Sequence, residues 1–202
     1  LYTLTMVETL YFLFGLIIAI TIHEFAHALI ADRLGDPTPR AQGRLTLNPL
    51  AHLDPVGTVM LLLFRFGWGK PVIFDPYNLA HPRRDAGIIS LAGPVSNLLL
   101  ATVLALVLRF LPLPQLFAPF FYLTILMNIT LAVFNLIPVY PLDGEKILAA
   151  LLPRDLAYEY QTVMSRYGTI ILIFMILPLF GTSPIISLIS PIIGFLSHLL
   201  IG

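Results

Sequence analysis

Long apolar runs separated by polar segments form the main pattern of this 202-residue sequence. A helix that spans a bilayer needs about 20 consecutive, mostly apolar residues, with a range of about 17 to 25. The pattern therefore predicts five membrane-spanning helices, the last two only marginal, at 6–31, 86–111, 116–137, 163–180 and 184–201. A further apolar run at 56–66 is too short to cross by itself, so we expect it to enter the membrane and return.

The segment at 32–85 lies between the first two predicted spans and mixes polar with apolar residues. Two parts of it have strand character: RLTLN at 44–48 alternates polar and apolar residues, and PVIF at 71–74 is short and β-branched. A disordered loop is the alternative, which the apolar content of the segment disfavours. We therefore expect an interfacial or re-entrant hairpin with a small membrane-associated β-sheet.

Composition narrows the class of protein further. Hydrophobic residues make up 58% of the chain and charged residues 11%, whereas an average soluble domain has about 25% charged residues. The formal net charge is zero and there is no basic tract, so nucleic acid is not an expected partner. The chain has no cysteine, which excludes disulfides and thiolate metal sites.

The expected fold class is an all-α polytopic membrane protein, with about five transmembrane helices plus a re-entrant segment and a small β-sheet. No linker or shift in composition divides the chain. We therefore expect one transmembrane domain over 1–202, with 32–85 as an insertion within it.

Basic residues predict the orientation of the chain. Seven of the eleven Lys and Arg residues lie within 32–85, and three more follow the third predicted span. If 56–66 does not cross, these two connections face the same side of the membrane. The positive-inside rule makes that side cytoplasmic and places the N-terminus outside.

The sequence TIHEFAH places His23, Glu24 and His27 inside the first apolar span. A charged residue at the centre of a membrane helix costs roughly 2.5 to 3.5 kcal/mol on insertion scales, so ionisable residues there are functional candidates. Residues four apart lie on one helix face, so both histidines can bind one metal ion, with Glu24 next to them as a general base. In a soluble helix the same four-position match arises by chance, but the apolar surroundings favour the metal site.

A catalytic zinc site usually has three protein ligands, and Asp143 in NLIPVYPLDGEKIL is the best candidate for the third. Pro138 and Pro141 interrupt the end of the third span, which places Asp143 on irregular backbone at membrane depth. The alternative is that Asp143 caps a helix at 144–152, and the two roles are compatible. The other histidines of the chain are weaker candidates.

Two asparagines within apolar spans have two interpretations each. Asn97, in LAGPVSNLLLA, and Asn135 can hydrogen-bond between helices, as Asn often does in membranes. Alternatively, each can donate to a peptide carbonyl or to the oxyanion that forms from it.

These motifs together resemble the site-2 protease family of intramembrane metalloproteases. HEFAH, GPVSN and NLIPVYPLDG occur in the order found in that family, and LTLNPLAHLDPVGT with GWGKPV resembles its short bacterial and archaeal branch, without PDZ or regulatory domains. The resemblance implies one zinc ion per chain, held by His23, His27 and Asp143, with Glu24 as the catalytic base. It also implies that Asn97 and Asn135 engage the substrate backbone.

The expected function is hydrolysis of peptide bonds within or near single-span transmembrane segments. The expected partners are transmembrane protein or peptide substrates and the lipid bilayer, and the expected location is the cell membrane with the active site toward the cytoplasm. A metal ion transporter is one alternative, but the sequence has no internal repeat and one ligand set. A non-catalytic metal-binding scaffold is another, although a scaffold has no need of Glu24. The sequence does not indicate an oligomeric state.

Overall fold

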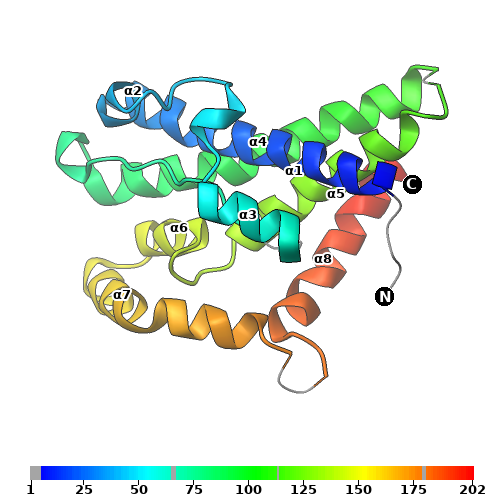
Figure 1. Ribbon diagram of the computed structural model, residues 1–202. Helices are drawn as coiled ribbons and strands as arrows, with labels where there is room; N and C mark the ends of the chain where they lie inside the picture. The colour runs from blue at the N-terminus through cyan, green and yellow to red at the C-terminus, as the bar shows by residue number, and fades with distance from the viewer. Residues whose placement is uncertain (1–5, 65–66, 113, 179–180) are drawn as a thin grey trace.

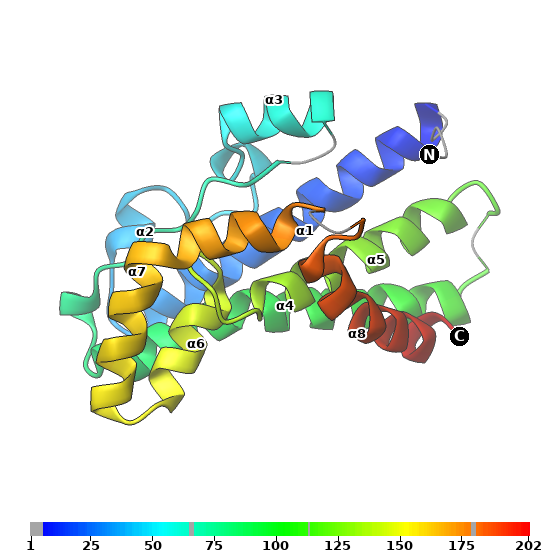
Figure 2. The ribbon, with the colours of Figure 1, turned by 90° about the horizontal axis from the view of Figure 1, so that it is seen from below.

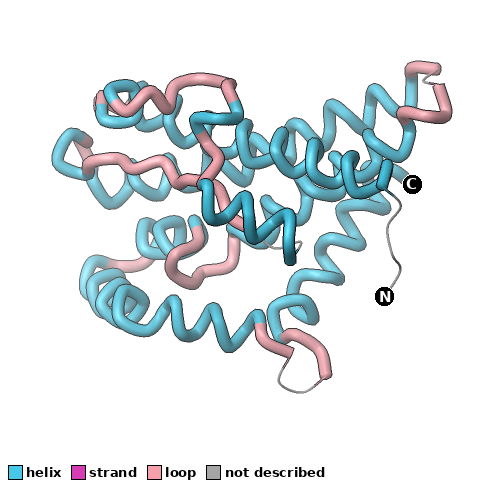
Figure 3. The backbone as a smooth tube through the Cα atoms, viewed as in Figure 1, coloured by secondary structure: helices cyan, strands magenta, loops and turns pink. Residues whose placement is uncertain are grey.

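The computed structural model describes residues 6–64, 67–112, 114–178 and 181–202, and helices dominate this part of the chain (Figures 1 and 3). The α-helices are α1 (Met6–Arg33), α2 (Thr38–Ala41), α3 (Pro55–Phe64), α4 (Pro82–Phe110), α5 (Ala118–Asn135), α6 (Asp143–Leu151), α7 (Arg154–Ile176) and α8 (Pro184–Ile201). Two short 3-10 helices are η1 (Pro49–Ala51) and η2 (Pro76–Asn78).

Within the described residues, four helices are long and apolar enough to cross a membrane: α1, α4, α5 and α8. The prediction of about five spans was therefore wrong, and the error lies at 163–180. Residues 163–176 of that region belong to α7, whose first 13 residues, 154–166, include the charged Glu159 and Arg166, so only its C-terminal part is apolar. Residues 179 and 180 lie outside the described part of the chain.

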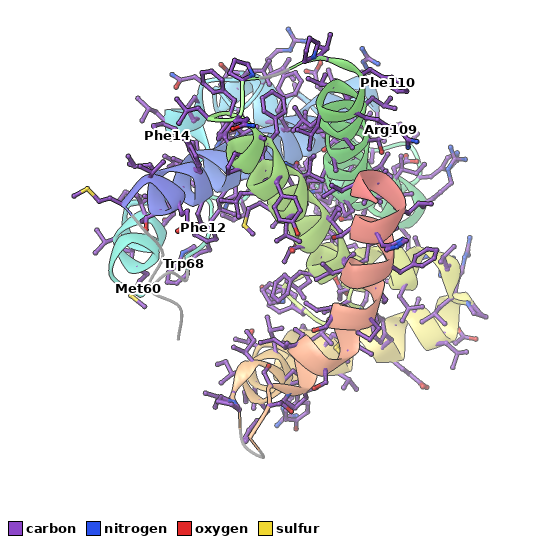
Figure 4. All side chains as sticks on the ribbon, turned by 90° about the vertical axis from the view of Figure 1, so that its right-hand side faces the viewer. Phe12, Phe14, Met60, Trp68, Arg109 and Phe110 are labelled. Atoms are coloured by element: carbon purple, nitrogen blue, oxygen red, sulfur yellow. The ribbon has the colours of Figure 1, made fainter. Side chains whose placement is uncertain are left out.

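Helices α1, α4 and α5 pack against one another, and α8 packs against α4 and α5. Small residues allow this close approach: Ala19 and Ala28 of α1 are fully buried, and Gly15 lies against Thr124 of α5. Large apolar side chains such as Phe14 and Phe110 are exposed and point away from the helices (Figure 4). This outward apolar surface is what contact with lipid requires.

The four spanning helices place the beginning of α1 and the end of α8 at the same end of the molecule (Figures 1 and 2). Helices α6 and α7 lie beside the other end of this bundle, where α6 packs against α4. Four crossings by these helices would place Met6 and Ile201 on the same side of a membrane.

The predicted β-sheet was wrong. In the described residues, 44–48 and 71–74 form no strands, and the one isolated bridge pairs Leu53 with Gly69. The physical reason is that side chains, rather than a second strand, form hydrogen bonds with the backbone C=O and N–H groups of 70–72. The guanidinium of Arg44 donates to the carbonyls of Lys70 and Pro71, at 3.2 and 3.4 Å, and the N–H of Val72 donates to a carboxylate of α1.

We call residues 67–75 the strap, because this extended segment crosses the face of α1 and is held near both ends. Arg44 is buried and also donates to the carbonyl of Ala51. At the other end, fully buried Asp36 accepts from the N–H of Asp75 at 2.7 Å and from Nδ2 of Asn78 at 2.8 Å. Two buried charges from the connection after α1 therefore determine where the strap lies.

The apolar run at 56–66 corresponds to α3, which has ten residues and is too short to span a bilayer. Residues 65 and 66 lie outside the described part of the chain. The expectations that this segment is re-entrant and that 1–202 is one domain stay predictions.

Candidate metal centre and active-site cavity

Helix α1 presents His23 and His27 on one buried face, with 4% and 7% of each residue exposed. Their rings meet edge to face, with centroids 4.6 Å apart. Because the two residues are four positions apart in a regular helix, local geometry alone brings the imidazoles together.

The Nδ1 atom of each imidazole has a partner on α4. His23 Nδ1 lies 2.7 Å from Oδ1 of Asn97, and His27 Nδ1 lies 2.7 Å from the carbonyl oxygen of Ile89. A carbonyl oxygen only accepts, so each Nδ1 carries the proton and each Nε2 keeps its lone pair. This is the arrangement by which proteins orient histidine ligands of metals.

Asp143 reaches these Nε2 atoms from the other side. Its Oδ2 lies 3.1 Å from Nε2 of His23 and 3.3 Å from Nε2 of His27. It is the first residue of α6, whose N-cap is Leu142 without a side-chain cap bond, so the predicted capping role of Asp143 is not seen. Gly144 is required here, because a Cβ would overlap the carbonyls of Leu136 and Ile137.

The donor set fits a divalent metal ion. One ligand atom from each of His23, His27 and Asp143 lies within 4.8 Å of the others, and Oδ2 of Asp143 is buried without a hydrogen-bond donor. Three acceptor atoms facing one point repel one another unless a cation or protons lie between them. Two imidazoles and one carboxylate are a common protein ligand set for catalytic zinc.

A cavity of about 390 Å³ opens beside these three residues. The strap forms one wall, through residues such as Trp68 and Val72, and the ends of α5 and α6 form another. Glu24 lines the cavity, and its Oε2 accepts from the backbone N–H of Val72 at 2.8 Å. Across the opening, Nζ of Lys146 lies 5.4 Å from the centre of the Phe74 ring.

The two asparagines predicted to bind substrate occupy different positions. Asn135 is half-buried and lines the cavity, with its Nδ2 bonded to the carbonyl of Leu131 at 3.0 Å. Asn97 is fully buried, and both ends of its amide are bonded within the protein. Their roles toward substrate stay predictions.

Sequence reasoning missed Asn128, which bonds to Asn97 at 2.8 Å and has no exposed surface. A signal was present, because Asn128 is a polar residue within an apolar span and lies seven positions, or nearly two helical turns, before Asn135. The contact between Val72 and Glu24 had no such signal, because a backbone N–H belongs to every residue except proline.

Comparison with known proteins adds to this geometry. The profile of peptidase family M50 matches residues 114–175. A Bacillus subtilis protein named "Putative zinc metalloprotease YwhC" is 39% identical over 179 residues, which cover 84% of this chain and 81% of that protein. No solved structure matches the chain.

Two mycobacterial proteins, both named "Putative zinc metalloprotease Rip2", are also similar. The one from Mycobacterium tuberculosis is 34% identical over 171 residues, covering 80% of this chain and 63% of that protein. The one from Mycolicibacterium smegmatis is 34% identical over 138 residues, covering 64% of this chain and 52% of that protein. The chain therefore spans between half and two thirds of each Rip2 protein.

The likeness to YwhC covers most of both chains, and the apolar helices make this an integral membrane protein. The family and its named relatives imply zinc, and the structure brings two histidines and an aspartate together as a fitting ligand set. The chain belongs to peptidase family M50, the site-2 protease family of zinc metalloproteases.

Proposed function

We propose that this protein hydrolyses peptide bonds within or near single-span transmembrane segments, using one zinc ion per chain. His23, His27 and Asp143 hold the ion, and Glu24 is the catalytic base. The observation that carries this proposal is the convergence of both Nε2 atoms on Asp143, beside a cavity that Glu24 lines.

When bound by two imidazoles and a carboxylate, zinc polarises a carbonyl and lowers the pKa of a coordinated water to about 7. The protein's own residues do the rest. The N–H of Val72 holds Oε2 of Glu24, which leaves Oε1 to take a proton from the attacking water and to pass it to the departing amine nitrogen.

Asn135 is the better placed of the two asparagines to contact a substrate, because it already lines the cavity. Its Nδ2 bonds to Leu131 with one hydrogen, and the second hydrogen can be donated to the scissile carbonyl. For Asn97 to do the same, its Nδ2 would have to give up its bond to Ala19 or to Asn128, because these two bonds use both amide hydrogens.

The substrate must reach the cavity with its peptide bond exposed. A transmembrane helix satisfies its backbone groups internally, so the peptide has to unwind near the cut. We therefore expect single-span proteins or peptides that carry helix-weakening residues there.

The proposed location is the cell membrane, with the site facing the cytoplasm. The site lies between the C-terminal part of α1 and the beginning of α6. The segment 32–85 leaves α1 at this end, and its sequence holds seven of the eleven basic residues. The positive-inside rule makes this end cytoplasmic in the cell membrane. Neutral net charge gives no reason to expect a nucleic-acid partner.

The test compares the wild-type protein with Glu24→Gln and Asp143→Ala after purification in detergent. Zinc is measured by mass spectrometry, and cleavage is measured on a labelled single-span peptide that contains Gly and Pro. We expect one zinc per wild-type chain with cleavage, zinc without cleavage in Glu24→Gln, and loss of both in Asp143→Ala.

The alternative functions predict a different result for the wild type. A transporter or a non-catalytic scaffold predicts zinc binding and no cleavage by the wild type. Full zinc retention in Asp143→Ala would remove that residue from the ligand set.

A further inference from the structure

A line of buried amides connects α5 with the metal centre. Asn97 of α4 and Asn128 of α5 have no exposed surface. Nδ2 of Asn128 donates to the carbonyl of Thr124 at 2.8 Å, and Oδ1 of Asn128 accepts from Nδ2 of Asn97 at 2.8 Å. Oδ1 of Asn97 then lies 2.7 Å from Nδ1 of His23.

The direction of every bond in this line is determined by the backbone. The carbonyl of Thr124 only accepts, so the NH₂ of Asn128 must face it and its oxygen must face Asn97. The carbonyl of Ala19 takes the other amide hydrogen of Asn97 at 2.9 Å. Both hydrogens of Asn97 are then used, and its oxygen is left for His23.

The consequence reaches the metal site through the imidazole of His23. An acceptor at Nδ1 places the proton on that nitrogen, so Nε2 keeps the lone pair that faces Asp143. His27 does not depend on the asparagines, because a backbone carbonyl, that of Ile89, holds its Nδ1. The two ligands are therefore oriented by different means.

We propose that Asn128 is a positioning residue of the metal centre, which acts through Asn97 to hold the tautomer and ring orientation of His23. This inference rests on the ligand set of the proposed function. Loss of Asn128 leaves one hydrogen of Asn97 unsatisfied in a buried site, and the amide turns or shifts to satisfy it. The orientation of His23 is then no longer held.

The competing explanation is that Asn128 only joins α4 to α5, as asparagines often do between membrane helices. In that case its removal lowers stability, and it affects zinc binding only through loss of the fold. The two explanations differ when His23 is replaced by alanine. Without the imidazole of His23, a positioning residue has nothing to orient, whereas a residue that only joins α4 to α5 keeps its effect.

The experiment measures zinc affinity by competition with a chromogenic chelator, on protein purified in detergent. Asn128→Leu is made in the wild-type background and in the His23→Ala background. Loss of a residue that orients a metal ligand typically weakens metal binding by about 10- to 100-fold. We expect a loss of that size in the wild-type background and no further loss in the His23→Ala background.

Thr124→Val is the matched control. Thr124 is buried on the same helix, one turn before Asn128, and its hydroxyl bonds to the carbonyl of Phe120 in its own helix. The substitution removes a buried polar group and keeps the backbone carbonyl that Asn128 needs. Zinc affinity should not change.

Thermal unfolding shows whether each variant is folded, and Asn128→Ser replaces Asn128→Leu in both backgrounds if the leucine variant does not fold. Unchanged zinc affinity, or an equal loss in both backgrounds, would overturn the positioning role.

The His23→Ala variant alone separates this failure from failure of the ligand set. If His23→Ala retains full zinc affinity, the proposed metal centre itself is wrong.

Discussion

Gly93 shows how closely α4 approaches the two imidazoles. A Cβ at this position would lie 2.5 Å from Nε2 of His27 and 2.6 Å from Cε1 of His23, closer than carbon atoms can pack. Helix α4 continues through Gly93 and Pro94 without interruption. The glycine is therefore needed for space at the metal centre rather than to break the helix.

Gly93→Ala should weaken zinc binding while the helix itself forms normally, because alanine favours a helix more than glycine does. The added methyl group must displace an imidazole, and displaced ligands typically lose about 10-fold or more in affinity. Chelator competition measures the loss. Gly194→Ala on α8 is the control, since nothing lies within 4 Å of a Cβ there. Equal zinc affinity in the two variants would contradict the close approach.

Among the elements of the structure, the strap depends most on contacts that are distant in sequence. Asp36 holds its far end as an ionised carboxylate. Burial raises the pKa of Asp36, but hydrogen bonds from Thr38, Asn78 and the N–H of Asp75 lower it more, so the pKa lies below its usual value. The folded state therefore binds the proton more weakly than the unfolded state does.

This lowered pKa predicts acid sensitivity of the strap. The stabilisation is complete above the usual aspartate pKa of about 3.9 and is lost as pH falls through the lower folded-state pKa. Hydrogen bonds to a charged group contribute roughly 1.5 to 3 kcal/mol each. Thermal unfolding between pH 3 and 6, followed by fluorescence of the single tryptophan, Trp68, measures the effect.

The wild type should lose stability in acid more steeply than Asp36→Asn, which lacks the titrating group. Asp155→Asn, at an exposed position in the first turn of α7, should behave like the wild type. Parallel pH profiles for wild type and Asp36→Asn would show that Asp36 does not hold the strap as a charged group.

At the scale of the whole molecule, the packing of the helices determines how a peptide bond of a substrate would reach the proposed site. The proposed metal centre lies between α1, α4 and α6, and the strap covers one side of the adjacent cavity. If the substrate is a transmembrane segment, as we propose, its intact helix keeps the peptide bonds hidden, and the cost of unwinding becomes part of the barrier to cleavage.

Substrate peptides should therefore differ in cleavage rate according to helix strength. Gly and Pro weaken a helix by about 1 and 3 kcal/mol relative to Ala, and each 1.4 kcal/mol corresponds to about tenfold in rate. A single-span peptide with Gly-Pro near its cytoplasmic end should be cut at least about 10-fold faster than a poly-Leu span. Equal rates for the two peptides would show that unwinding does not limit the reaction.

The parts of the protein that sequence reasoning predicted depend on local or compositional rules. His23 and His27 share a face because any helix brings residues four apart together. Helices α1, α4, α5 and α8 lie near predicted spans because apolar length is itself the physical requirement for crossing. Asp143 was predicted because two prolines interrupt the span before it.

The parts that sequence reasoning missed depend on partners that are far away along the chain. The strap was expected to be a strand, since PVIF has strand character, but Glu24, Arg44 and Asp36 bind its backbone groups instead. The C-terminal part of α7 was wrongly predicted to span the membrane, because its apolar run was considered apart from the polar N-terminal part of the same helix.

Local helix geometry and apolar length thus follow from the order of residues alone, and they were enough to place two histidines in a membrane helix. The direction of the Asn97 amide, the proton on His23 and the need for Gly93 do not follow from that order. Each of them depends on an atom of another helix, and such distances exist only once the helices have packed.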